Sequence, residues 1–90
     1  MGSMTFNEMW LGYEKLLNSQ PGKALELEDH HIAVLIGDEV CIAQLSDDNK
    51  HVLDCGSFDP RSWVGDEEAE RVISNPVFVG IDHLDFSAFK

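Results

Sequence analysis

The chain contains few basic residues. Only 6 of its 90 residues are lysine or arginine, against 17 aspartates and glutamates, so its formal net charge is −11. Without a basic patch, a protein releases no counterions from nucleic-acid phosphates and has no attraction for anionic lipid. We therefore expect no direct contact with nucleic acid and none with a membrane. The acidic excess favours a basic protein partner, or serves solubility alone.

Cysteine and long hydrophobic runs are also scarce. The two cysteines are too few for a disulfide framework. The longest apolar run, residues 32–36, is far short of the roughly 20 residues that span a bilayer. No charged segment followed by an apolar one opens the chain, as it does in a secretory signal. These absences predict a reduced, cytoplasmic protein.

Motifs for catalysis and metal binding are missing. There is no GxSxG, GxGxxG or P-loop pattern and no CxxC pair. His30 and His31 are adjacent, so in a strand they point to opposite faces and cannot chelate one ion together. We expect no catalytic residue, no metal and no cofactor, and we interpret the histidines as polar residues near turns.

The composition is that of one folded domain. Met1, Gly2 and Ser3 precede a second methionine and are interpreted as a vector-derived scar. The hydrophobic fraction of 43% is ordinary for a globular protein. The length suits one compact domain, which we expect to span residues 4–90.

The N-terminal segment predicts an amphipathic helix over residues 5–18. Thr5 and Glu8 have the spacing of a capping box, in which each side chain accepts from the other residue's backbone N–H. A Pro-Gly pair at residues 21–22 ends the helix. A short strand or extended lead-in follows at residues 23–28. The helix has one apolar stripe, which consists of Phe6, Met9, Trp10, Tyr13, Leu16 and Leu17.

Strand-forming residues are concentrated in residues 31–58, which predict a three-stranded antiparallel meander. The Gly-Asp pair at residues 37–38 fits a two-residue hairpin turn, and residues 46–50 form a polar second loop. In this register Cys41 lies opposite Cys55. We interpret the two cysteines as small buried hydrophobes, close enough for a disulfide but not requiring one.

Alternation of side chains sorts this meander onto two faces. The first face is nearly all apolar, and we expect the N-terminal helix to pack on it. Its residues are Ile32, Val34, Ile36, Cys41, Ala43, Leu45, Leu53 and Cys55. The second face is mixed but too apolar for water, so either the C-terminal third or a second copy of the chain covers it. A homodimer interface is therefore expected there. The candidate interface residues are Leu35, Val40, Ile42 and Val52.

The C-terminal third predicts short elements. Pro60 opens a turn through Trp63, Asp66–Ser74 forms a short helix with an acidic first turn, and residues 77–81 form another strand. The tail anchors are expected to be Leu84, Phe86 and Phe89. The predicted fold is α+β, with the N-terminal helix packed on a three- to four-stranded antiparallel sheet and a short second helix near residues 66–74.

Acidic residues cluster at several turns, where they can steer a basic partner. The candidate acidic contact residues are Asp38, Glu39, Asp47, Asp48, Glu67 and Glu68. The predicted function is a small acidic, non-enzymatic protein-binding module, an inhibitor, immunity factor or adaptor that acts as a homodimer. The alternatives are an acidic nucleic-acid mimic that blocks a DNA- or RNA-binding protein and, least favoured, a small enzyme.

The order of elements, a helix followed by a sheet in an acidic chain, resembles that of the small type III secretion chaperones. The resemblance lies in this order and in no signature residue. The chain is short for that family and lacks room for its long C-terminal helix. The resemblance implies a secretion-chaperone-like adaptor as a further alternative.

Overall fold

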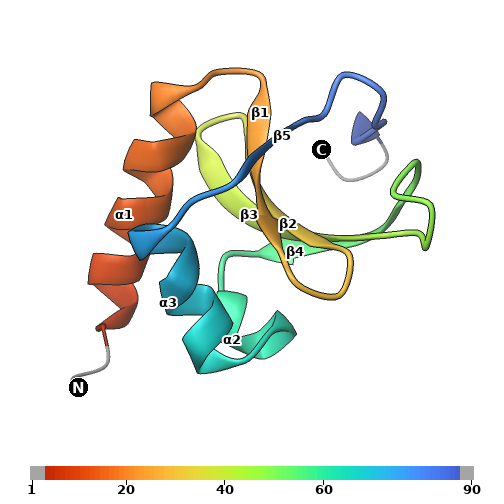
Figure 1. The fold of residues 1–90 in the computed structure, drawn as a ribbon. Coiled ribbons are helices and arrows are strands. Elements are labelled where there is room, and N and C mark those ends of the chain that lie inside the picture. Colours follow the sequence, from red (N-terminus) through yellow and green to blue (C-terminus); the bar gives the residue numbers. More distant parts are fainter. Residues whose placement is uncertain (1–3, 88–90) are drawn as a thin grey trace.

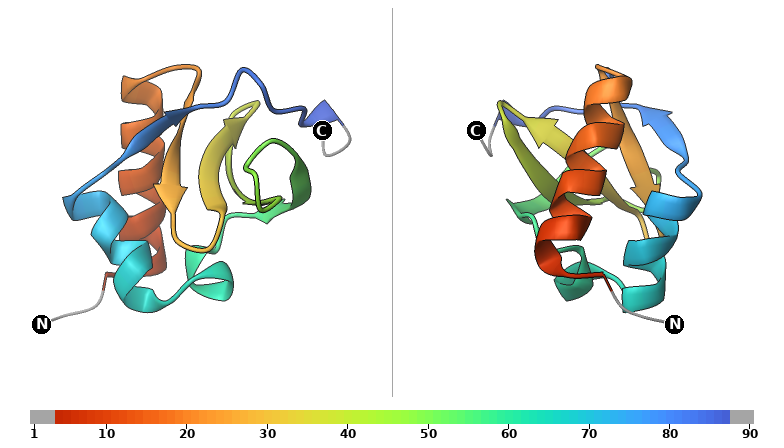
Figure 2. Two further views of the ribbon diagram at one scale, coloured as in Figure 1. Left: turned by 45° about the vertical axis from the view of Figure 1, so that its right-hand side comes forward. Right: turned by 90° about the vertical axis from the view of Figure 1, so that its left-hand side faces the viewer.

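The computed structural model describes residues 4–87 and contains a five-stranded antiparallel sheet with helices on one face (Figure 1 and Figure 2). Along the chain the elements are α1 (Phe6–Ser19), β1 (Lys23–Leu27), β2 (His31–Ile36), β3 (Glu39–Leu45), β4 (Val52–Ser57), α2 (Pro60–Trp63), α3 (Asp66–Ser74) and β5 (Phe78–Gly80). The strand order is β4-β3-β2-β1-β5. The predicted α+β fold is confirmed, with more strands than predicted because β1 and β5 both join the sheet. The predicted scar at residues 1–3 and the anchor Phe89 lie outside the described residues.

Local signals determine where α1 begins. The hydroxyl of Thr5 accepts a hydrogen bond from the backbone N of Glu8 at 3.1 Å, and the Glu8 carboxylate accepts one from the backbone N of Thr5 at 2.9 Å. The predicted capping box is therefore present. The helix ends at Ser19, one residue later than predicted. Its buried residues are Met9, Tyr13 and Leu17.

The meander predicted at residues 31–58 is present as β2, β3 and β4. Gly37 has a φ of +65° in the β2–β3 turn, the left-handed backbone that a glycine-first hairpin turn requires. Between β3 and β4 the predicted register is wrong, because Cys41 lies opposite Ser57 rather than Cys55. Two changes cause this shift of two residues. The β3–β4 loop is one residue longer than predicted, so that Leu45 pairs with Val52, and a bulge next to this pair leaves one further residue of β4 unpaired.

Helices α1 and α3 pack on one face of the sheet, which we call the helix face (right-hand view of Figure 2). Its buried strand residues are Leu25, Leu27, Ala33, Val40 and Ile42. The prediction that α1 packs on the face that carries Ile32 and Val34 is therefore wrong. Gly56 lets Trp63 of α2 pack closely on the sheet, because an added Cβ there would lie 3.1 Å from Cζ2 of Trp63.

The opposite face of the sheet, which we call the tail face, is crossed by the C-terminal tail, residues 81–87 (Figure 1). Its buried strand residues are Ala24, Ile32, Val34, Ala43 and Leu45. The tail packs on them through Ile81, Leu84 and Phe86, which confirms two of the predicted anchors. One of the two predicted alternatives is therefore confirmed, because the C-terminal third covers the face of the sheet that the helices leave open. The face that it covers is the one on which α1 was expected to pack.

Candidate functional site

The four residues predicted as a protein interface do not share a surface. Val40 and Ile42 are 2% and 0% exposed and belong to the core beneath α1. Leu35 is partly buried against the same core, whereas Val52 lies on the tail face. Three of these side chains thus support α1 from within one chain, and only Val52 lies on the tail face.

The six predicted acidic contact residues lie at three separate places. They are Asp38 and Glu39 at the β2–β3 turn, Asp47 and Asp48 in the β3–β4 loop, and Glu67 and Glu68 in the first turn of α3. Asp48 orders its own loop, since its carboxylate accepts from Oγ of Ser46 at 2.5 Å and from the backbone N of Lys50 at 3.0 Å. The turn and the loop flank opposite ends of β3, so these acids do not form one continuous surface.

Glu68 has a structural role. Its carboxylate accepts from Nε and a terminal nitrogen of Arg71 at 2.7 and 2.8 Å, and from the backbone N of Glu28 at 2.8 Å. Arg71 also donates to the backbone O of Glu26 at 3.1 Å. The pair therefore ties α3 to β1. Hydrogen bonds from Arg71 hold the pKa of Glu68 below its usual range.

Glu68→Gln is expected to lower the free energy of unfolding by about 1–2 kcal/mol at pH 7, because it weakens charge-assisted hydrogen bonds. The pKa of Glu68 is lower in the folded state than its unfolded value of about 4.3, so the ionised carboxylate stabilises the fold fully above that pH. This contribution is lost as the pH falls through the folded pKa. The difference from wild type should therefore shrink below about pH 4. Urea unfolding at several pH values measures it. The control is Glu67→Gln, an exposed neighbour of equal charge. Equal losses in both variants at every pH would contradict the role of the pair.

Cys41 and Cys55 are free thiols on neighbouring strands, and both are half-buried. The two residues are not directly opposed, and the thiol of Cys41 donates to the backbone O of Glu39 at 3.9 Å. Burial raises the pKa of both thiols, that of Cys55 to about 11. A raised pKa is typical of an inert thiol rather than a nucleophile, because the thiolate is the reactive form.

At pH 8, iodoacetamide is expected to alkylate Cys55 about 100-fold more slowly in the folded protein than in the urea-unfolded chain. The reason is that a pKa of about 11 leaves far less thiolate than the ordinary cysteine value of about 8.5. Mass spectrometry of the peptides of the wild-type chain over time follows this one thiol and leaves Cys41, which also raises the Cys55 pKa, in place. Equal rates in the two states would show that burial does not protect it.

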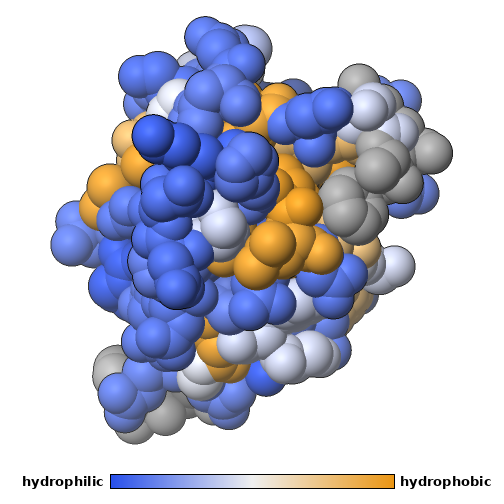
Figure 3. All heavy atoms as spheres, turned by 90° about the vertical axis from the view of Figure 1, so that its right-hand side faces the viewer, coloured by the Kyte–Doolittle hydropathy of each residue, from blue (hydrophilic) through white to orange (hydrophobic). Residues whose placement is uncertain are grey.

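The tail face keeps an apolar surface that the tail does not fully cover (Figure 3). The half-buried side chains around its centre are Ile36, Val52, Cys55, Val79, Ile81, Leu84 and Phe86. Near the sheet edges, Leu53 and Val77 are 59% and 42% exposed. Glu26 and Glu39 project beside this surface, because directly paired residues share a face and their partners are on the tail face. An apolar centre with an acidic border results.

A pocket of about 280 Å³ opens between the β1–β2 turn, the β3–β4 loop and the tail, and we call it the hairpin pocket. Its apolar lining includes Ile32, Leu45, Val79 and Leu84. Its polar lining includes Glu26, His30, Asn49 and His83. An apolar cavity with a few convergent polar groups is the usual form of a binding site.

Asn49 connects two histidines of the hairpin pocket. Its side-chain Oδ1 is 2.8 Å from Nδ1 of His30, and its backbone O is 3.0 Å from Nε2 of His83. The β1–β2 turn, the β3–β4 loop and the tail therefore meet at one residue. All three side chains are exposed, so a ligand can reach them.

The β1–β2 turn holds His30 in an unusual backbone conformation. Asp29 and His30 have φ values of +56° and +62°, and the backbone N of His31 donates to O of Glu28 at 3.2 Å. Positive φ at both central residues is typical of a type I′ turn, which prefers glycine or asparagine. A histidine there costs backbone energy that glycine would avoid. Strain at a residue with a specific side-chain contact is typical of functional sites.

The pocket was not predictable from motifs. His30 and His83 are 19 and 34 positions from Asn49, so no local pattern joins them. Among residues 4–87, no group of three or more histidine, cysteine, aspartate or glutamate side chains is placed to hold a metal ion. In the same part of the chain, no helix is both long and apolar enough to cross a membrane.

Comparison with known proteins found no match. Neither a family model, nor a curated protein, nor a solved structure matches the chain.

Proposed function

We propose that this protein is a small acidic, non-enzymatic protein-binding module, an inhibitor, immunity factor or adaptor whose contact surface is the tail face. The observation that carries the proposal is the half-exposed apolar surface around Val52 and Phe86, bordered by Glu26 and Glu39. Protein interfaces combine an apolar centre with a polar rim. Two free thiols also suit the reducing cytoplasm, the compartment we propose.

The charge of the chain favours a basic partner over a second copy. Each copy carries a formal charge of −11, so two tail faces repel each other, whereas a basic partner is attracted and oriented. The two cases differ in their response to salt. Screening weakens the contact with a basic partner but favours a homodimer.

The proposal is tested by photo-crosslinking in cells that express the chain natively. A photoreactive residue replaces Val52 on the tail face or, as a control, Leu11, which is 57% exposed on α1. We expect one discrete protein adduct from position 52, none from position 11, and less adduct at high salt. Equal adducts from both positions, or none from position 52, would overturn the proposal. An adduct with the mass of two chains would instead indicate the homodimer.

The acids give less support to a nucleic-acid mimic. Such a mimic needs carboxylates spaced regularly over one surface, but the predicted acids lie at three separate places and one of them, Glu68, is paired with Arg71.

A further inference from the structure

We propose that the hairpin pocket binds the guanidinium group of an arginine side chain carried by the partner. This inference rests on the proposed function and names the chemical group that anchors the partner. Its basis is the set of acceptor atoms that the pocket presents, since Asn49 determines which nitrogen of each neighbouring imidazole carries the proton.

Asn49 offers only oxygen atoms to the two rings. A carbonyl oxygen accepts and cannot donate, so Nε2 of His83 donates to the backbone O of Asn49 and Nδ1 of His30 donates to its Oδ1. In a neutral imidazole the other nitrogen then carries a lone pair. Nε2 of His30 and Nδ1 of His83 are therefore hydrogen-bond acceptors.

Glu26 adds negative charge to these acceptors. Its side chain lies on the tail face, is exposed, and lines the hairpin pocket with the two histidines. Arg71 is the cation that interacts electrostatically with Glu26, but its guanidinium is held by Glu68. Among residues 4–87, no lysine or arginine lines the hairpin pocket itself. The pocket thus combines an exposed carboxylate with two acceptor nitrogens.

The walls of the pocket fit an aliphatic stem. Ile32, Leu45, Val79 and Leu84 are apolar and lie beside the acceptors. A volume of about 280 Å³ is at the lower limit for small-molecule sites and suits one long side chain. Arginine packs its methylene groups on apolar surface while its charged head reaches polar groups.

The spread of the acceptors favours a guanidinium over a metal ion. Within residues 4–87, Glu26, His30 and His83 are not among any three side chains close enough to hold one ion. A metal needs its ligands within about 2.0–2.2 Å of a single centre. A guanidinium instead presents five N–H donors across a planar fork and can reach acceptors that lie apart.

The test is a titration of the full-length, ¹⁵N-labelled protein with N-acetyl-arginine amide, followed by NMR. We expect saturable shifts of the backbone of Asn49 and of the imidazole nitrogens of His30 and His83, with a Kd of about 1–10 mM. N-acetyl-norleucine amide, which has an aliphatic stem and no charge, should bind at least about tenfold more weakly.

A matched pair of variants tests the role of charge. Glu26→Gln should weaken binding of the arginine amide about tenfold, because it removes a charge-assisted hydrogen bond. Glu39→Gln removes the same charge at the other end of the tail face and should change the Kd less than twofold. The spectrum of each variant verifies that it is folded. Equal effects of the two substitutions would overturn the inference.

Three further outcomes would also overturn it. These are equal binding of the norleucine amide, micromolar binding of Zn²⁺ alone at His30 and His83, and no saturable shift at tens of millimolar arginine amide. The proposed function is judged separately by the crosslink from position 52. If that adduct forms while the arginine amide does not bind, only the pocket inference fails. If the amide binds and the adduct is absent, the proposed function fails, and the pocket keeps its preference for a guanidinium but loses the partner that would carry it.

Discussion

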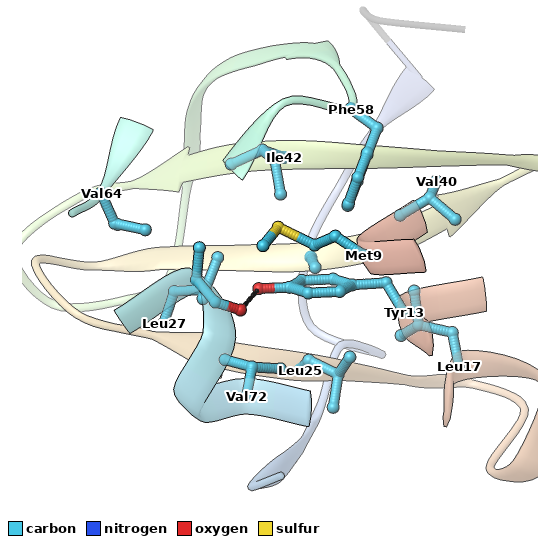
Figure 4. Close-up of a cluster of buried hydrophobic side chains, with 12 residues drawn as sticks. Met9, Tyr13, Leu17, Leu25, Leu27, Val40, Ile42, Phe58, Val64 and Val72 are labelled. Carbon is cyan, nitrogen blue, oxygen red and sulfur yellow. Dashed lines mark hydrogen bonds between the residues drawn. The ribbon is translucent and has the colours of Figure 1, made fainter. Parts of the chain in front are cut away.

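Ile42→Asp is expected to unfold the chain at neutral pH. Ile42 is 0% exposed and lies beneath α1 near Met9 and Phe58 (Figure 4). Losing a buried isoleucine costs about 2–5 kcal/mol, and an unpaired buried carboxylate adds several more. A domain of this length is stable by roughly 5–13 kcal/mol. Far-ultraviolet circular dichroism and one-dimensional NMR at 25 °C measure the loss of structure.

The matched control is Val52→Asp on the tail face. Val52 is half-buried there, so the new carboxylate keeps contact with water and the variant should remain folded, with a loss of about 2 kcal/mol or less. If Ile42→Asp instead stays folded and changes only the oligomeric state, the face that carries Ile42 is an interface between chains. That outcome would contradict the packing of α1 described above.

Alternation alone could not decide which face receives α1. The sequence correctly separates most residues of the meander into two sets, because period-two patterning is a local property of strands. The more apolar set is not the one that receives α1, however, so hydrophobicity alone does not decide between the faces. What separates the faces is which distant segments reach them, since the helices pack on the set with Val40 and Ile42 and the tail packs on the set with Ile32. That information lies in the three-dimensional packing rather than in the pattern.

The register between β3 and β4 could not be predicted for a similar reason. The β2–β3 register was predictable because Gly37 and Asp38 define a two-residue turn. The β3–β4 connection is longer, and Leu45 pairs with Val52 whereas Gln44 pairs with Asp54, so one residue of β4 is left over. A bulge of this kind has no distinct sequence signal, and it moves every later pair in the ladder.

The candidate site depends on the same long-range geometry. Placing the histidines near turns describes His30 correctly, since it lies in the β1–β2 turn. Its contact with Asn49 depends on β2 and β3 pairing, which brings the β1–β2 turn beside the β3–β4 loop. His83 reaches the same residue only because the tail crosses the sheet. Topology, and not local preference, assembles the hairpin pocket.

Tyr13→Ala is expected to lower the free energy of unfolding by about 4 kcal/mol. Tyr13 is 0% exposed, and its hydroxyl donates to the backbone O of Ala69 at 2.6 Å, which joins α1 to α3 (Figure 4). Its ring also packs edge to face on Phe58 at a centroid distance of 5.0 Å. Tyr13→Phe keeps the ring and loses only the hydrogen bond, so it should cost about 1–2 kcal/mol. Urea unfolding at pH 7 measures both variants. Equal losses of stability in the two variants would show that the ring contributes nothing beyond the hydrogen bond.

The same residue predicts alkaline unfolding. Burial, reinforced by the charge of Glu68, raises the pKa of Tyr13 above its usual range. The unfolded chain ionises at about pH 10, so above that pH it binds fewer protons than the folded state and stability falls by up to about 1.4 kcal/mol per pH unit. Tyr13 is the one tyrosine of the chain, so tyrosinate absorbance reports on it alone. The absorbance should rise together with the loss of circular dichroism, and in Tyr13→Phe this decline in stability should be absent. Tyrosinate that appears near pH 10 in a still folded chain would show that α3 does not seal the hydroxyl from water.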